Sequence, residues 1–134
     1  MYNMGYNDGD IGGKHVFINL SNHPSSQWGD AQRQDALAYG EIIDLAYPQI
    51  PVTIENDAMD ALVNSYYDQI VRYDKPTVML QGEPVFAYRL TNRLKAAGIK
   101  VLAGCTERVA IEEKMDDGSI KKVSKFCYGG MREY

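Results

Sequence analysis

Residues 77–108 read TVMLQGEPVFAYRLTNRLKAAGIKVLAGCTER, and this stretch decides the fold. Its apolar start, residues 77–81, predicts a strand buried on both faces. Pro84 suits the first position of a helix that Gly98 ends, and residues 99–105 predict a further strand. Because a strand that turns through a glycine corner into a helix directs backbone N–H groups at one point, the corner before Pro84 predicts a ligand site.

The rest of the chain alternates in the same way. Strands are expected at His15–Leu20 and Glu41–Ala46, and helices at Gln27–Tyr39, N-capped by Ser25 or Ser26, and after a cap at Thr53. Parallel neighbours need a crossover between them, so the alternation predicts a Rossmann-like, three-layer α/β domain. Its mostly parallel sheet would have the strand order 2-1-3-4. Val109–Glu113 and Ile120–Tyr128 add a C-terminal β-hairpin.

Length and composition limit what the chain can be. Its 134 residues predict one domain, residues 15–134, preceded by a glycine-rich, flexible tail at residues 1–14. That tail lacks the apolar core and basic start of a signal peptide, and no apolar run is long enough for a membrane span. We therefore expect a soluble, cytoplasmic protein with no membrane partner.

Charge and cysteine content exclude several classes of partner. A formal charge of -4 and a pI near 5.1 argue against DNA, because polyphosphate binding needs many basic contacts. A small anionic ligand remains compatible with local basic residues. Cys105 and Cys127, with only His15 and His23, form no recognisable metal set, so we expect no metal, no cofactor and two buried free thiols.

If the first strand is central, a crevice opens between strands one and three. The loop Ser21–Ser26, the corner Gln81–Pro84 and the segment Thr106–Arg108 would meet there. Hydroxyl, amide and imidazole groups of the first loop could hold a phosphate or a ribose, although the same residues serve any strand-to-helix turn. His23 is either a proton-transfer group or a structural histidine. Trp28 either stacks on a base or packs in the core or a dimer.

The corner itself carries neither the repeated glycines of a dinucleotide site nor the lysine of a P-loop, which argues against NAD and ATP. Gly82 either lets the backbone approach a ligand or makes the turn. Arg108 could bind a phosphate in a bidentate manner or pair with Glu107 as a surface salt bridge. Tyr88 and Arg89 follow the corner closely on the helix.

Several of these residues together resemble a known family. They are Gln81-Gly82-Glu83, Tyr88, Asn92, Gly98, Thr106, Arg108, Lys125-Phe126 and Arg132-Glu133-Tyr134, with the opening Asn19 to Trp28. Over residues 16–134 the chain resembles small stand-alone CRISPR-associated proteins of the CARF (CRISPR-associated Rossmann fold) group, some of which are ring nucleases.

The resemblance implies a homodimer that binds cyclic oligoadenylate across its two-fold axis. It implies metal-independent cleavage, in which an adenosine 2′-hydroxyl attacks the adjacent phosphodiester and leaves a 2′,3′-cyclic phosphate. A non-catalytic sensor or sponge and a protein-interaction module are the alternatives. The expected catalytic residues are His23, Ser25, Ser26 and Arg108, and the expected ligand contacts are Ser21, Asn22, Trp28, Gln81, Gly82, Glu83, Tyr88, Arg89, Thr106 and Arg132.

Overall fold

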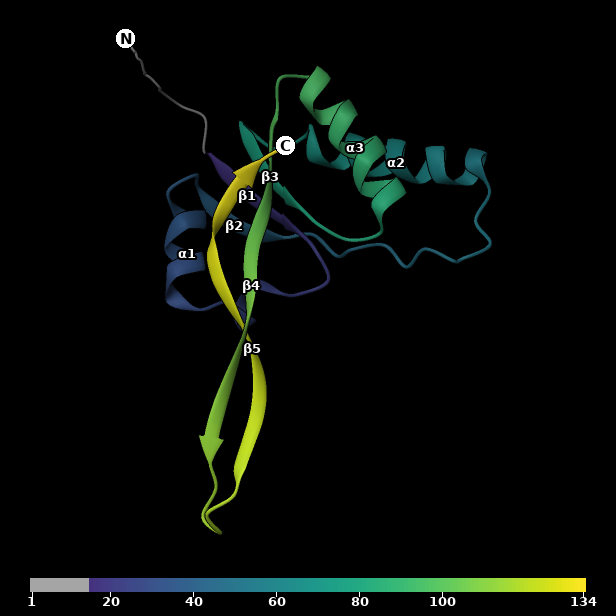
Figure 1. Ribbon diagram of the computed structural model, residues 1–134. Coiled ribbons are helices and arrows are strands. Elements are labelled where there is room, and N and C mark those ends of the chain that lie inside the picture. Colours follow the sequence, from purple (N-terminus) through teal and green to yellow (C-terminus); the bar gives the residue numbers. More distant parts are fainter. Residues whose placement is uncertain (1–14) are drawn as a thin grey trace.

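The computed structural model describes residues 15–134 as a mixed α/β fold around one five-stranded sheet (Figure 1). The spatial order is β2-β1-β3-β4-β5, with the first four strands parallel and β5 antiparallel to β4. The expected order 2-1-3-4 is thus confirmed, and the C-terminal hairpin adds a fifth strand. The strand bounds are β1 Val16–Leu20, β2 Glu41–Asp44, β3 Pro76–Leu80, β4 Lys100–Lys114 and β5 Ile120–Glu133.

Helices cover both faces of the sheet (Figure 1). Helix α1, Asp30–Leu37, lies on one face, while α2, Asn56–Ile70, and α3, Pro84–Ala96, pack against each other on the opposite face. Successive side chains of a strand point to opposite faces. Ile18 of β1 therefore joins a large apolar cluster with α2 and α3, whereas its neighbour Phe17 joins a smaller cluster beside α1.

The start of α1 differs from the expectation. Neither Ser25 nor Ser26 caps this helix, which begins at Asp30 after the N-cap Gly29. The Ser25 hydroxyl instead donates a hydrogen bond to Asp44 at the end of β2, at 2.9 Å. Because this bond ties the loop to the sheet, residues 25–27 form a separate 3-10 turn before the helix.

The other helix boundaries were predicted more closely. The N-cap of α2 is Glu55, so the expected cap at Thr53 is wrong. The predicted end of α3 is confirmed, since Gly98 follows the C-cap with φ +80°, a conformation that glycine adopts without strain. Ala97, the C-cap itself, is exposed.

Strand β4 is much longer than expected. The prediction that it stops at Cys105 and that Thr106–Arg108 forms a loop is wrong, because β4 runs unbroken from Lys100–Lys114. Strand β5 pairs with it throughout, from Leu102 opposite Glu133 to Lys114 opposite Ile120. Polar residues that suggest a loop are thus held in a strand by a partner that follows later in the chain.

The hairpin bends where it passes the edge of the sheet. Gly129 and Gly130 of β5 lie opposite Cys105 alone, which makes a β-bulge, and Gly130 has φ +107°. Beyond this bulge the two strands leave the body as a projecting ribbon, residues 105–114 and 120–128, which we call the arm (Figure 1).

The cysteines are not the buried thiols that we expected. Cys105 is half-buried at the base of the arm, and Cys127 is exposed on it. Both lie on the arm, which no described helix covers along its length, and this explains their exposure. The expected flexible tail, residues 1–14, lies outside the described residues.

Candidate functional site

The loop after β1 is held by a polar network at the carboxyl ends of β1 and β2. Asn19 is buried and donates from its side-chain amide to the His23 carbonyl at 2.8 Å and to Asp44 at 2.9 Å. The Ser21 hydroxyl donates to Asn19 Oδ1 at 2.7 Å. These bonds satisfy a buried side chain and set the path of residues 21–25 across the sheet edge.

Asp44 is the charged centre of this network. Its carboxylate accepts the hydroxyl and the backbone N–H of Ser25, and Arg33 of α1 lies nearby. Partial burial raises the pKa of Asp44, but the hydrogen bonds from Asn19 and Ser25, with the charge of Arg33, outweigh it and leave the pKa below its usual value. A negative charge at the end of β2 therefore lies next to Ser25.

The side chains of His23 and Ser26 are differently placed. Both residues are exposed on the loop, as is Asn22. Among the described residues, neither the His23 imidazole nor the Ser26 hydroxyl has a hydrogen-bond partner. Of the candidate catalytic groups on this loop, these two remain available to a ligand, whereas Ser25 is engaged by Asp44.

The corner after β3 forms largely as predicted. Glu83 is the N-cap of α3 and Pro84 its first residue, and the Glu83 carboxylate accepts the N–H of Phe86 at 2.7 Å. A carboxylate already meets the positive end of this helix. The corner is therefore a weaker anion-binding site than the sequence predicted.

Gln81 extends the sheet beyond the end of β3. Its side-chain oxygen accepts the N–H of Gly104 at 2.9 Å, and its amide nitrogen donates to the Gly104 carbonyl at 3.2 Å. The side chain thus takes the place of a further β3 residue in pairing with β4. This pairing closes the gap between the strands immediately before the bulge.

A cavity of about 370 Å³ lies beside the corner. Tyr88 stands at its rim and is 70% exposed, and the hydroxyl of Tyr134 donates to the Leu80 carbonyl at 2.7 Å. The cavity is lined by Gln81, Gly82, Pro84, Ala87, Tyr88, Thr91 and Tyr134. Three of the predicted ligand contacts, Gln81, Gly82 and Tyr88, therefore share one cavity.

Gly82 is glycine because Tyr47 occupies the space where a side chain would lie. An added Cβ would be 2.0 Å from Cζ of the Tyr47 ring, which packs on Phe86 with centroids 5.5 Å apart. Burial raises the pKa of Tyr47 to about 12, against a lowering by the nearby Glu83 backbone. Within residues 15–134 its hydroxyl makes no hydrogen bond of normal geometry.

Trp28 lies on the opposite face of the sheet from this cavity. It follows the 3-10 turn and meets Phe17 edge to face, with ring centroids 6.2 Å apart, as part of the smaller apolar cluster. Of the uses open to this residue, core packing is the one that the contacts show.

Three predicted contacts lie on the hairpin, and none of them lines the cavity beside the corner. Thr106 and Arg108 belong to the arm and pair with Tyr128 and Phe126, and the Arg108 guanidinium lies 5.1 Å from the Phe126 ring centroid. Arg132 pairs with Ala103 on the outer strand. The expectation that residues 106–108 reach the crevice as a loop is therefore wrong.

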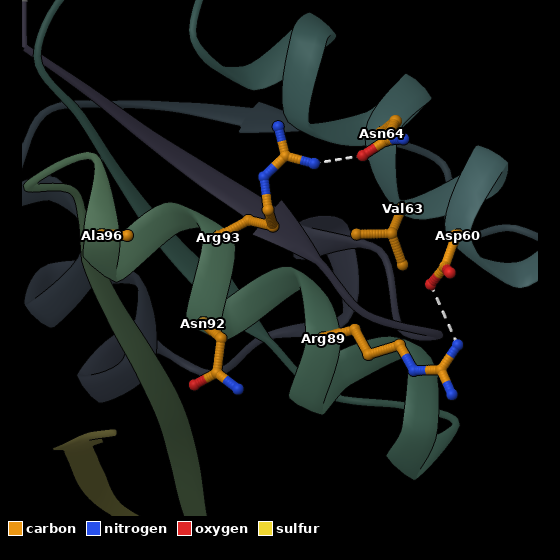
Figure 2. A pocket seen from close by; sticks show the side chains of 7 residues that line it. All are labelled: Asp60, Val63, Asn64, Arg89, Asn92, Arg93 and Ala96. Carbon is orange, nitrogen blue, oxygen red and sulfur yellow. Dashed lines mark hydrogen bonds and ion pairs between the residues drawn. The ribbon is translucent and has the colours of Figure 1, made fainter.

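Arg89 lies in another hollow, the groove of about 510 Å³ between α2 and α3. Figure 2 shows it extending toward Asp60, while Arg93 extends toward Asn64. Arg89 bonds Asp60 and Asn56, each at 3.0 Å. Both arginines thus bridge the two helices, and Arg89 lines this groove instead of the cavity beside the corner.

Asn19, Asp44 and Tyr134 were not among the predicted site residues. Asn19 is the last but one residue of a strand that reads as apolar, and Asp44 ends another, so a polar residue near each strand end was the available signal. Tyr134 reaches the corner only because β5 lies antiparallel to β4. No local pattern marks such a contact.

The described part of the chain shows no group of three metal-ligating side chains, and none of its helices is long and apolar enough to cross a membrane. No curated protein and no solved structure matches the sequence significantly. Residues 15–132 match a protein family across nearly all of the described fold. The chain belongs to the uncharacterized protein MJ1673 family.

Proposed function

We propose that this protein is a Rossmann-like ring nuclease of the CARF group that binds cyclic oligoadenylate at the carboxyl edge of its sheet. The observation that carries the proposal is the cavity beside the corner, which Tyr88 and Tyr134 help to line. It lies at the end of β3, next to the point where the strand order reverses between β1 and β3, the usual ligand position in such sheets.

The size and lining of the cavity favour one nucleotide unit. Its volume of about 370 Å³ is at the small end of the range for small-molecule sites. Exposed Tyr88 offers a face for an adenine base, and stacking of this kind contributes about 1–3 kcal/mol per base. Two copies related by a two-fold axis would each hold one half of a symmetric ring.

Cleavage in this proposal depends on positioning. The chain holds one adenosine so that its 2′-hydroxyl lies in line with the neighbouring phosphodiester, and the ribose oxygen displaces the 5′-oxygen to leave a 2′,3′-cyclic phosphate. The His23 imidazole and the Ser26 hydroxyl are the free groups on the β1 loop for proton transfer and for stabilising charge on the phosphate.

A non-catalytic sensor or sponge is the second candidate. The Asp44 carboxylate engages Ser25 at 2.9 Å and would repel a phosphate at that hydroxyl. Arg108, the strongest candidate for holding phosphate, lies on the arm over Phe126. Both observations favour binding without cleavage.

Incubation with cyclic tetra- and hexa-adenylate in EDTA, followed by mass spectrometry, tests both candidates. Linear products that end in a 2′,3′-cyclic phosphate support the nuclease. An intact ring with a raised melting temperature supports the sensor. An intact ring without any thermal shift contradicts both.

Variants of two tyrosines locate the site. Tyr88→Ala should weaken binding by about 1–3 kcal/mol, because it removes the stacking face. Tyr73→Ala is the matched control, since Tyr73 is also exposed but follows α2, outside the cavity. If both variants bind cyclic oligoadenylate with equal affinity, Tyr88 does not contact the ligand.

His23→Ala separates catalysis from binding. Turnover should fall more than affinity if the imidazole transfers a proton, and the rate should then change between about pH 5 and 8. A flat pH profile in the wild-type protein would rule out this role for His23.

A further inference from the structure

The arm is a two-stranded ribbon that nothing described covers along its length. Strand β3 pairs with β4 only as far as Leu102, whereas β4 and β5 stay paired to Lys114 and Ile120. At about 3.3 Å per residue, ten strand residues extend roughly 30 Å. Figure 1 shows this ribbon pointing away from the helices.

Such a ribbon is unstable by itself. A lone pair of strands is marginally stable in water and needs a third strand or an apolar partner. At its base the arm is anchored to α1, where the Tyr128 hydroxyl donates to Asp35 at 2.6 Å. Farther out, neither edge of the arm pairs with a further strand among residues 15–134, and free strand edges readily accept another chain.

One face of the arm carries an apolar centre. Directly opposed residues share a face, so Ile111 lies beside Val123, and Val109 precedes them on the same side. These three side chains are only half-buried. We call them the apolar strip.

Charges flank the apolar strip in a self-complementary pattern. On this face β4 presents Glu107 and Glu113, while β5 presents Lys121 and Lys125. One strand is thus acidic and the other basic, and a second arm can set its basic strand against the acidic strand of the first.

The charge count argues against nucleic acid or an anionic membrane as the occupant. The arm and its turn contain as many acidic as basic side chains, so they present no net positive field. The acidic members are Glu107, Glu112, Glu113, Asp116 and Asp117, and the basic ones are Arg108, Lys114, Lys121, Lys122 and Lys125.

We propose that the arm is a dimerisation element whose partner is the arm of a second copy of this chain. The apolar strips of the two copies pack together, and the acidic β4 of each faces the basic β5 of the other. This contact gives the ribbon an apolar partner, which residues 15–134 of one copy do not supply along the length of the arm. It needs no nucleotide.

The mass of the full chain in solution is the first test. Light scattering should give about twice 15.1 kDa for the wild-type protein and the monomer mass for Ile111→Asp with Val123→Asp. The matched control, Ala110→Asp with Ser124→Asp, changes the directly opposed pair on the other face and should remain dimeric. Circular dichroism confirms that all three are folded.

Charge reversal provides a second test, which can be read even if the aspartate variants fail to fold. Glu107→Lys with Glu113→Lys, and Lys121→Glu with Lys125→Glu, should each be monomeric alone because both strands then carry one sign. An equimolar mixture should recover the dimer mass. Recovery is specific to pairing between acidic and basic strands.

Three results would overturn the proposal: a monomeric wild-type chain, a dimer that persists in the strip variant, or a mixture that stays monomeric. None of these involves cyclic oligoadenylate. A dimer that dissociates as expected while the ring is neither bound nor cut would therefore refute the proposed function and leave the arm contact standing.

Discussion

At the scale of single residues, a few specific contacts shape the carboxyl edge of the sheet. Gly82 lies against the Tyr47 ring, and Gln81 pairs with the backbone of Gly104. Asp44 joins the ends of two strands to the β1 loop. These contacts set the shape of the carboxyl edge, and two of them lead to direct predictions.

Gly82→Ala should lower the free energy of unfolding by about 1–3 kcal/mol, the usual cost of overpacking. The new Cβ would lie 2.0 Å from a ring that packing against Phe86 holds in place. Chemical denaturation measures the loss. Gly29→Ala is the control: no atom lies within 4 Å of its added Cβ, so it should lose only the N-cap preference for glycine over alanine. Equal losses of unfolding free energy in the two variants would show that the Tyr47 ring moves aside without cost.

Asp44→Asn should remove a pH-dependent part of the stability. The pKa of Asp44 is lowered in the folded state, so the carboxylate stabilises the fold above its unfolded value of 3.8, and this contribution is lost as the pH falls through the lower folded pKa. Urea unfolding from neutral to acidic pH should show the two proteins converging. Ser25→Ala, which removes one donor, should reduce the same dependence.

At the scale of elements, α3 and β4 differ in how locally they are specified. Pro84 and Gly98 bound the helix, and both positions were readable from the sequence because capping depends on near neighbours. The length of β4 was not readable. Among the described strands, its outer half pairs with β5 alone, and β5 starts after the turn.

Glu83→Ala should lower the free energy of unfolding by about 1 kcal/mol, the typical effect of losing an N-cap acceptor. The carboxylate accepts the Phe86 N–H at 2.7 Å. Glu83→Gln keeps an acceptor without the charge, so its loss should be smaller. Thermal unfolding of the three proteins makes the comparison, and equal stability of all three would exclude a capping role.

At the scale of the whole molecule, a compact sheet with helices on both faces carries a ribbon that projects beyond it (Figure 1). The body buries its core around β1 and β3, while the arm has only a half-buried strip. Stability should therefore be uneven along the chain.

Hydrogen exchange should reveal this difference. Amides of the arm should exchange quickly in dilute protein and more slowly as concentration rises, because dimer formation covers them. Amides of β1 should be protected at every concentration, since this strand is buried and lies between β2 and β3. Exchange in the arm that is independent of concentration would contradict self-association there.

The sequence alone determined the alternation of strands and helices and the corner at Gln81–Pro84, because apolar periodicity and capping act over a few residues. Tertiary structure decided which polar groups are free. In the folded chain Ser25 is hydrogen-bonded to Asp44, Tyr134 lies at the corner, and Arg108 lies on the arm. These outcomes depend on pairing between distant segments, for which a single sequence holds no local signal.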